Sequence, residues 1–324
     1  MLWLALAAAV LTWALIGGYI HVMNARRQLD IPNARSMHKR PVPSGAGIIA
    51  IVVSLAAWFM AVSHVTPMMK LLAVCALLLS ALGWLDDMLN LPARLRFGAQ
   101  LAAVLACLWQ LSPDLRALPA IPLSVERFIE ALAWAWFVNL FNFMDGIDGL
   151  AGSEAASVGL GYVMIAGVSA TLSPLGILFA ATMLGYLAWN WAPSRVMMGD
   201  AGSIPLGFLL GWMMLDLALG GYLLAALILT LAFWLDATYT LIARLLRGKL
   251  PHEAHREHFY QRAALGCGSH ARVVAGFMVA NVALLLLALL SLQRPLIALF
   301  ATLLLASALF GWLQHLSRAR ESAT

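Results

Sequence analysis

The chain has 324 residues, of which 63% are apolar and 11% are charged. A soluble globular domain carries about 25% charged residues, so this composition excludes an ordinary soluble domain and is typical of a multi-pass membrane protein. The formal net charge is +5, but the basic residues lie between apolar runs. Membrane topology produces that pattern, and we therefore expect no nucleic-acid partner.

Eleven apolar runs approach the length of about 20 residues that a helix needs to cross a bilayer. In chain order, their cores lie at 2–22, 46–64, 69–85, 97–112, 125–141, 154–171, 174–191, 204–219, 221–245, 271–291 and 295–315. The first run lacks a basic leader and a small-residue cleavage signal, so we expect it to be a retained helix. The sequence predicts one domain over residues 1–324, an all-α integral membrane protein of ten to eleven transmembrane helices.

The basic residues predict the orientation of these helices. If the N-terminus lies outside, sixteen of the twenty Lys and Arg residues fall in inner segments. The four exceptions are Lys70, Arg116, Arg127 and Arg294. Because positively charged loops stay in the cytoplasm, we expect a periplasmic N-terminus and a cytoplasmic C-terminus.

Carboxylates gather at the inner ends of the predicted helices. Asp86 and Asp87 close the third helix, Asp145 and Asp148 follow the fifth, and Asp200 precedes the eighth. Any one of them alone could be a solvated helix cap. Adjacent carboxylates, however, oppose each other's ionisation, and capping requires no such pair. Several carboxylates on one face suit Mg²⁺, which typically binds one or two carboxylates together with substrate phosphates.

Two basic loops complete this pattern. Segment 23–44 holds five cationic residues, including Lys39 and Arg40, and segment 246–270 holds four histidines, including His255 and His258. These histidines could also be solvated loop residues. A divalent cation, cationic side chains and a site at the membrane surface together favour phosphoryl transfer to a lipid.

At these motifs the chain resembles the polyprenyl-phosphate N-acetylhexosamine-1-phosphate transferases of glycosyltransferase family 4. That group includes the enzymes that initiate O-antigen and enterobacterial common antigen and, more distantly, the phospho-MurNAc-pentapeptide transferases. The resemblance covers about residues 20–265 as five motifs in the same order. They are Asp30 to His38; Asp86-Asp87 with Arg94-Leu95-Arg96; Asn139 to Leu150; Asn190 with Met198 to Ser203; and Asp236 with Arg244 and the histidine segment.

The resemblance implies a fold, a reaction and a location. The fold is a helical bundle around a cytoplasmic cleft in the bacterial inner membrane. The reaction transfers HexNAc-1-phosphate from UDP-GlcNAc, or from a 6-deoxy donor such as UDP-FucNAc or UDP-QuiNAc, to undecaprenyl phosphate and releases UMP. It would start O-antigen lipopolysaccharide or a related envelope glycan. The implied cofactor is Mg²⁺, for which Mn²⁺ can substitute, and the implied assembly is a homodimer.

The resemblance also assigns roles to residues of this chain. The catalytic group comprises Asp86, Asp87, Asp200, His255 and His258, with Asp200 as the Mg²⁺ ligand and Asp86 and Asp87 as further candidate ligands. The substrate-binding group comprises Lys39, Arg40, Arg96, Asn142, Asp145, Gly146, Asp148, Asn190 and Arg256.

One departure and two alternatives remain. Glu257 stands where the family commonly has the middle histidine of its H-x-H-H motif, which affects the roles of His255 and His258. The first alternative is the phospho-MurNAc-pentapeptide transferase reaction of peptidoglycan synthesis. The second is a secondary transporter, which would place its carboxylates near the bilayer midplane in broken helices.

Overall fold

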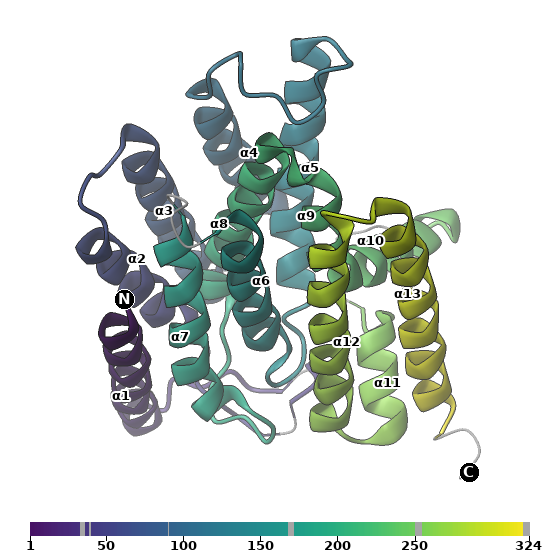
Figure 1. The fold of residues 1–324 in the computed structure, drawn as a ribbon. Coiled ribbons are helices and arrows are strands. Elements are labelled where there is room, and N and C mark those ends of the chain that lie inside the picture. Colours follow the sequence, from purple (N-terminus) through teal and green to yellow (C-terminus); the bar gives the residue numbers. More distant parts are fainter. Residues whose placement is uncertain (33–35, 39, 90, 168–171, 250–254, 320–324) are drawn as a thin grey trace.

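The computed structural model describes residues 1–32, 36–38, 40–89, 91–167, 172–249 and 255–319. Within these ranges the chain is helical and forms no β-strand, apart from one antiparallel bridge between Asp30 and Val42. The helices pack side by side in one bundle (Figure 1). The all-α expectation is therefore confirmed.

Within the described ranges, each predicted apolar core overlaps helical residues over most of its length, and residues 168–171 of the sixth core lie outside those ranges. In chain order the described elements are α1 (Leu2–Arg26), α2 (Gly47–Ala61), α3 (Pro67–Leu89), α4 (Ala93–Trp109), α5 (Leu123–Phe143), α6 (Leu150–Ala166), α7 (Ser173–Asn190), α8 (Asp200–Leu217), the π-helical turn η1 (Ala218–Tyr222), α9 (Leu223–Leu229), α10 (Leu231–Leu246), α11 (Phe259–Cys267), α12 (His270–Ser291) and α13 (Pro295–Arg318).

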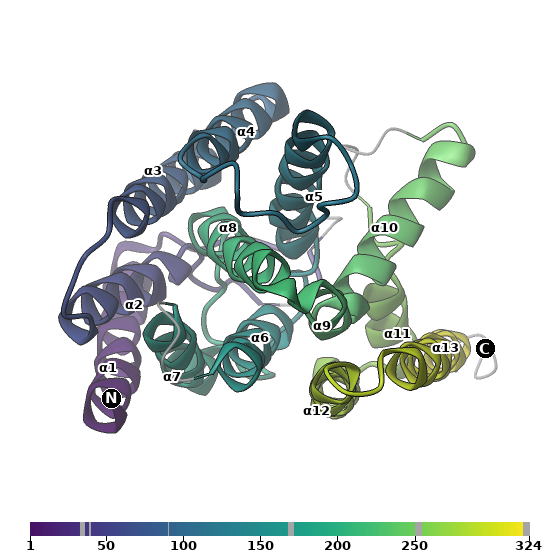
Figure 2. The same cartoon turned by 45° about the horizontal axis from the view of Figure 1, so that its top comes forward.

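The ninth predicted helix, 221–245, is not continuous, which corrects the sequence-based expectation. Its start coincides with a kink at Gly221, where the sequence predicts the division from the eighth helix; Gly221 has φ 88° within η1, a left-handed conformation that glycine adopts without a steric penalty. The unpredicted break lies at Thr230, between α9 and α10. As a result α10 projects sideways from the bundle (Figure 2). The short helix α11 was not predicted and lies in the histidine-containing segment.

Five helical segments are long and apolar enough to cross a membrane. They are α1, α3, α8 continued through α9, α12 and α13, and α2 and α6 are shorter apolar helices. The chain is therefore a multi-pass membrane protein, while the count of ten to eleven spans stays a prediction.

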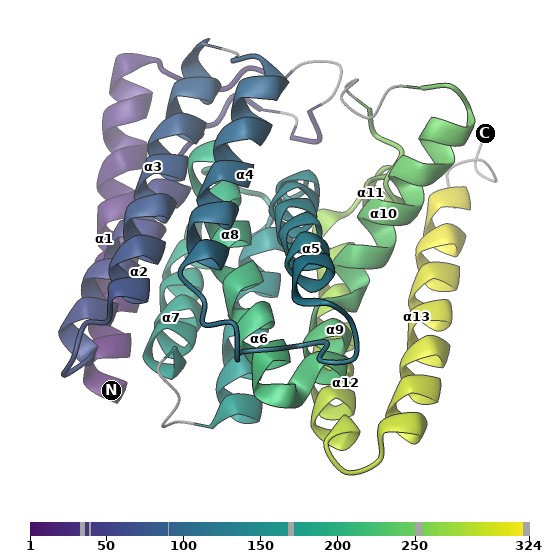
Figure 3. The same cartoon turned by 90° about the horizontal axis from the view of Figure 1, so that it is seen from above.

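The two ends of the bundle differ in charge. One end carries segments 27–32, 191–199 and 247–249 and the C-terminal end of α13. The N-terminus and the loop between α4 and α5 lie at the opposite end (Figure 3). We call the first the inner end, because it holds most of the basic loops, and the second the outer end.

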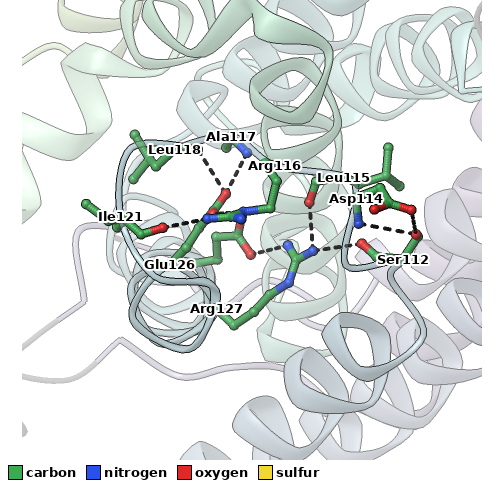
Figure 4. A network of polar contacts seen from close by, with 10 residues as sticks. Ser112, Asp114, Leu115, Arg116, Ala117, Leu118, Ile121, Glu126 and Arg127 are labelled. Atoms are coloured by element: carbon green, nitrogen blue, oxygen red, sulfur yellow. Dashed lines mark hydrogen bonds and ion pairs between the residues drawn. The ribbon is translucent and has the colours of Figure 1, made fainter.

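The loop between α4 and α5 is held by two arginine–glutamate pairs at the outer end (Figure 4). The buried Glu126 accepts hydrogen bonds from Arg116 and from the backbone N–H groups of Ala117 and Leu118. Arg127 binds Glu130 at 2.7 Å and also donates to two carbonyls of the loop. Arg116 and Arg127 are two of the four cationic residues that fall outside the inner segments, and the structure gives both a role in holding this loop.

Helix α8 lies in the middle of the bundle and positions the site (Figure 2). Most of its residues are buried, but Asp200 at its first position is partly accessible. The positive end of the helix dipole stabilises a carboxylate there. The fold therefore presents one acidic residue at the inner end of its central helix.

Candidate active site

The inner ends of α3 and α8 bring three carboxylates together. Asp86 and Asp87 lie in the last turn of α3, and Ser80 anchors this helix to α8 by donating to the Ala201 carbonyl at 2.6 Å. The Asp87 carboxylate accepts a hydrogen bond from the Asp200 backbone N–H at 3.3 Å. We call Asp86, Asp87 and Asp200 the aspartate cluster.

Arg96 of α4 bridges two members of the cluster. One guanidinium nitrogen lies 2.6 Å from Asp86 and 3.1 Å from Asp200. The second oxygen of Asp86 accepts from the Leu91 N–H at 2.7 Å, so Asp86 is held at both oxygens. Among the described residues, one guanidinium therefore contacts two of the three clustered carboxylates, and Asp87 makes no ion pair with it. Such an excess of negative charge favours binding of a further cation.

The carboxylate ligands fit an Mg²⁺ site whose coordination is completed by substrate phosphates. Within the described ranges, no three His, Cys, Asp or Glu side chains are arranged to hold a metal ion without other ligands. Mg²⁺ does not need such a cage, because it usually binds one or two carboxylates and keeps waters or phosphate oxygens as its other ligands. Asp200 and Asp87 meet that requirement, because their carboxylate oxygens are hard ligands and accept few hydrogen bonds from the protein.

The loop between α5 and α6 lies beside the cluster. Asn142, at the end of α5, accepts a hydrogen bond from Ser203 of α8 at 3.0 Å. Asp145 follows and has no hydrogen-bond partner for its side chain in the described part of the chain. Burial raises the pKa of Asp145 well above its usual value, and the negative charges of Asp200, Asp87 and Asp148 raise it further. Asp145 thus belongs to the same acidic site.

Asp148 and Asn190 hold neighbouring loops together by hydrogen bonds within the chain. Asp148 accepts from the Ser194 hydroxyl at 2.9 Å and lies 3.2 Å from the His270 ring. Burial alone would raise the pKa of Asp148, but hydrogen bonds from His270 and Ser194 lower it below its usual value. Asn190 accepts from the Gly149 N–H and donates to the Val196 carbonyl, both at 2.8 Å. Their predicted contacts with substrate stay predictions.

The histidine segment is fixed to the buried carboxylate of Asp236 on α10. Asp236 accepts from the backbone N–H groups of Phe259 and Tyr260 at 3.0 Å and contacts the His258 Nδ1 atom at 3.2 Å. It therefore satisfies the first donors of α11, which any helix start leaves open. Tyr260 in turn donates to the Phe143 carbonyl at 2.8 Å, so α11 packs on the loop that carries Asp145.

Glu257 binds three cations. Its carboxylate lies 2.5 Å from Arg244, 3.1 Å from Arg247 and 2.8 Å from Lys249. The hydrogen bond from Lys249 lowers the pKa of Glu257, and the charge of Arg244 adds to this effect. The residue that replaces the middle histidine thus joins the end of α10 to the histidine segment.

His255 is half-buried and lies against His258, with ring centres 4.9 Å apart. Burial lowers the pKa of His255 to about 4, and the charges of His258 and Arg244 lower it in the same direction. At neutral pH His255 is therefore uncharged and can contribute a hydrogen bond but no positive charge.

A family model matches the part of the chain that carries this site. The profile of glycosyl transferase family 4 matches residues 68–218, which include the aspartate cluster and Asp145. The chain is thus similar to this family over just under half of its length.

Three relatives show how far the similarity extends along the chain. A probable undecaprenyl-phosphate N-acetylglucosaminyl 1-phosphate transferase of Bacillus subtilis (strain 168) is 26% identical over 78% of this chain and 74% of its own length. The corresponding α-N-acetylglucosaminyl enzyme of Yersinia pestis is 27% identical over 72% and 68%. A phospho-N-acetylmuramoyl-pentapeptide-transferase of Microcystis aeruginosa is 28% identical over 80% and 79%.

The remaining predicted site residues lie less centrally. Arg40 is exposed on the segment that leads to α2, Arg256 is half-buried beside His255, and Lys39 lies outside the described residues. Gly146 faces Tyr260 so closely that a Cβ atom there would lie 2.1 Å from the tyrosine hydroxyl. The substrate contacts of these four residues stay predictions.

Three residues of this site were not predicted from the sequence. Ser194 and His270 hold Asp148, and Tyr260 supports the loop next to Gly146. His270 is one of the four histidines of segment 246–270, and its spacing indicates no carboxylate partner. The other two lie in no acidic or glycine-rich motif, so their contacts emerge only when α7, α11 and α12 pack together.

Gly199 should be the least replaceable glycine of the site. It has φ 71° and ψ 168°, and a Cβ atom would lie 2.6 Å from Asp87 Oδ2 and 2.7 Å from the Gly45 nitrogen. We expect Gly199→Ala to lower the free energy of unfolding by about 1–3 kcal/mol and to displace Asp87. Thermal unfolding and UMP release would measure both effects.

The matched control for Gly199→Ala is Gly98→Ala in α4, where an added Cβ atom meets nothing within 4 Å. Because alanine favours a helix over glycine, the control should stabilise the protein by about 0.5–1 kcal/mol. Equal stability and equal turnover of the two variants would contradict the role given to Gly199.

Proposed function

We propose that this protein transfers N-acetylhexosamine-1-phosphate from a UDP-N-acetylhexosamine to undecaprenyl phosphate and releases UMP. The observation that carries the proposal is the aspartate cluster at the inner end of a membrane bundle, where Arg96 bridges Asp86 and Asp200 and Asp87 accepts from the Asp200 backbone N–H. Two of the relatives above carry names that describe this class of reaction. We place the protein in the bacterial inner membrane, with the inner end in the cytoplasm, where nucleotide sugars are found.

The chemistry exchanges one diphosphate linkage for another. An oxygen of the lipid phosphate attacks the phosphorus that bears the sugar, the bond from that phosphorus to the bridging oxygen breaks, and UMP leaves with that oxygen. A phosphate monoester with a second pKa of about 6 is mostly dianionic at neutral pH, so the attack needs no proton removal. The main barrier is repulsion between two anions, which the site must offset.

The residues of the aspartate cluster would divide this work. Asp200, with Asp87 or Asp86, would hold Mg²⁺, which when bound supplies the positive charge that neutralises the diphosphate. Asp86 holds Arg96 at 2.6 Å and so orients the guanidinium toward Asp200. We therefore assign Asp86 and Asp87 to positioning rather than to base catalysis.

The second part of the site would orient the donor. Asp236 fixes the Nδ1 side of the His258 ring, which leaves the Nε2 side for a phosphate or sugar oxygen. Asn142, Asp145, Gly146, Asp148 and Asn190 would form or support the uridine-binding side, with Lys39, Arg40 and Arg256 near the phosphates. Asn190 and Asp148 would act mainly by holding the loops, since the structure engages both in contacts within the chain.

A chelator experiment tests the cofactor. With purified protein in lipid, UDP-GlcNAc and undecaprenyl phosphate, EDTA is expected to stop UMP release, and excess Mg²⁺ or Mn²⁺ to restore it. The reason is that two anions must otherwise meet within an acidic site. A control without acceptor lipid measures background hydrolysis. Turnover that persists in EDTA would contradict the metal-dependent mechanism.

A second candidate donor is UDP-MurNAc-pentapeptide, because the Microcystis aeruginosa relative is named for that reaction and covers most of the chain. A panel of this donor, UDP-GlcNAc and 6-deoxy-HexNAc donors, read out as UMP release, would distinguish the two functions. We favour the HexNAc donors, and selective turnover of the pentapeptide donor would overturn that choice. The transporter alternative has less support, since the aspartates lie at helix ends.

A further inference from the structure

A groove of about 400 Å³ runs along the outside of the bundle between α12 and α13. Arg272 and Trp312 lie at its inner end, and Gly276, Val279, Leu305 and Leu309 line it further along. The Trp312 ring lies directly over Gly276, where a Cβ atom would be 2.2 Å from it. The groove thus combines a polar mouth with an apolar channel.

Both helices that form the groove are long and apolar enough to cross a membrane. Val279 is 72% exposed within the protein, so its side chain faces the surrounding bilayer. The rise along α12 from Arg272 to Val279 is about 10 Å, which leads from the level of lipid headgroups into the hydrocarbon region. A hydrocarbon chain is therefore the natural occupant of the channel.

The mouth of the groove favours a ligand with a negative charge. The Arg272 side chain is exposed, and within the described part of the chain its guanidinium makes no hydrogen bond or ion pair. Tryptophan and arginine at this depth are typical of the membrane interface, and a guanidinium there attracts anionic headgroups. We propose that the groove binds one acyl chain of an anionic phospholipid whose phosphate contacts Arg272.

The position of the groove argues against the acceptor lipid as its occupant. Helices α12 and α13 lie on the opposite side of the bundle from α3 and α4, which carry Asp86, Asp87 and Arg96 (Figure 2). A phosphate held at Arg272 is therefore remote from the aspartate cluster. A bilayer phospholipid, which need not react, fits this location.

The groove is connected to the catalytic loop through the first turn of α12. Arg272 is two residues from His270, whose ring lies 3.2 Å from Asp148. A lipid that steadies this turn should also steady Asp148, so anionic lipid is expected to support turnover. This consequence, unlike the binding itself, rests on the proposed function.

Native mass spectrometry of the full chain released from mixed nanodiscs of phosphatidylglycerol and phosphatidylcholine tests the binding. The wild type is expected to retain phosphatidylglycerol in preference to phosphatidylcholine. Arg272→Gln should lower this retention about fivefold, as expected for one interfacial cation. Arg318→Gln is the matched control, because Arg318 is an exposed cation at the same end but does not line the groove.

A second pair of variants tests the channel itself. Val279→Trp fills the groove and should reduce lipid retention. Val282→Trp places the same side chain at a 61% exposed position of α12 that does not line the groove, and it should leave retention unchanged. Thermal unfolding of all four variants confirms that they fold.

Three results would overturn the proposal. The first is equal retention of the two lipids by the wild type, together with no effect of Arg272→Gln or Val279→Trp. The second is displacement of phosphatidylglycerol by an equimolar polyprenyl phosphate, which would make the acceptor lipid the occupant. The third is a dimer that Val279→Trp alone dissociates, which would make the groove an interface between two copies. None of these readouts depends on transferase activity.

Discussion

Replacing Asp200 with asparagine is expected to reduce UMP release by about 10²–10³-fold or more while the protein still folds. Asparagine keeps the size of the side chain and one hydrogen-bond acceptor for Arg96, which also retains its contact with Asp86. The change removes the negative charge that the proposed Mg²⁺ site needs at the start of α8. Steady-state UMP release at saturating Mg²⁺, with thermal unfolding as the folding check, measures the effect.

Asp114→Asn is the matched control for Asp200→Asn. Asp114 is an exposed carboxylate in the loop between α4 and α5 at the outer end, far from the aspartate cluster. The same chemical change there should leave turnover unchanged. Wild-type turnover in Asp200→Asn, with folding intact, would remove Asp200 from the metal site and require another carboxylate in its place.

Replacing Asp236 with asparagine is expected to affect both stability and turnover. The buried Asp236 carboxylate accepts from two backbone N–H groups at the start of α11 and contacts His258. An amide has one acceptor oxygen fewer, so at least one buried donor loses its partner, at a cost of about 1–3 kcal/mol in free energy of unfolding. Displacement of the histidine segment should lower turnover by about 10²-fold. Denaturation curves and UMP release measure the two effects separately.

A double-mutant cycle separates the role of Asp236 in positioning His258 from a role in stability alone. If Asp236 acts on turnover through His258, the double variant Asp236→Asn/His258→Gln should be about as slow as His258→Gln by itself. Additive losses from the two substitutions would show that Asp236 affects turnover through another residue. Thr240→Val, which removes a longer contact of 3.4 Å to the same carboxylate, serves as the mild control.

Most of the helical framework could be predicted from the sequence, because a chain with 63% apolar residues has few ways to satisfy its backbone in a membrane. The runs around Met1–Val22 and Pro295–His315 needed only length and hydropathy. The break at Thr230 inside the ninth predicted helix was missed. Apolar periodicity does not distinguish a continuous helix from two helices, α9 and α10, joined at Thr230, since both bury the same residues.

The position of the acidic residues in the chain also predicted part of the site. Asp86, Asp87 and Asp200 were expected at inner helix ends, and the structure brings them together, with Arg96 bridging Asp86 and Asp200 and with Asp87 bound to the Asp200 backbone N–H. The sequence did not indicate that Asp148 and Asn190 engage other parts of the chain. Those contacts depend on side-chain direction, which spacing does not specify.

By itself the sequence determined that this is a helical membrane protein with acidic helix ends and basic loops on one side. Hydrophobicity and charge act locally along the chain, so they can be read without a structure. Only the tertiary structure decided that Arg96 joins Asp86 to Asp200, that Asp236 holds the start of α11, and that a groove with Arg272 at its mouth separates α12 from α13. These features arise from contacts between helices distant in sequence, and only the packing of the whole bundle fixes such contacts.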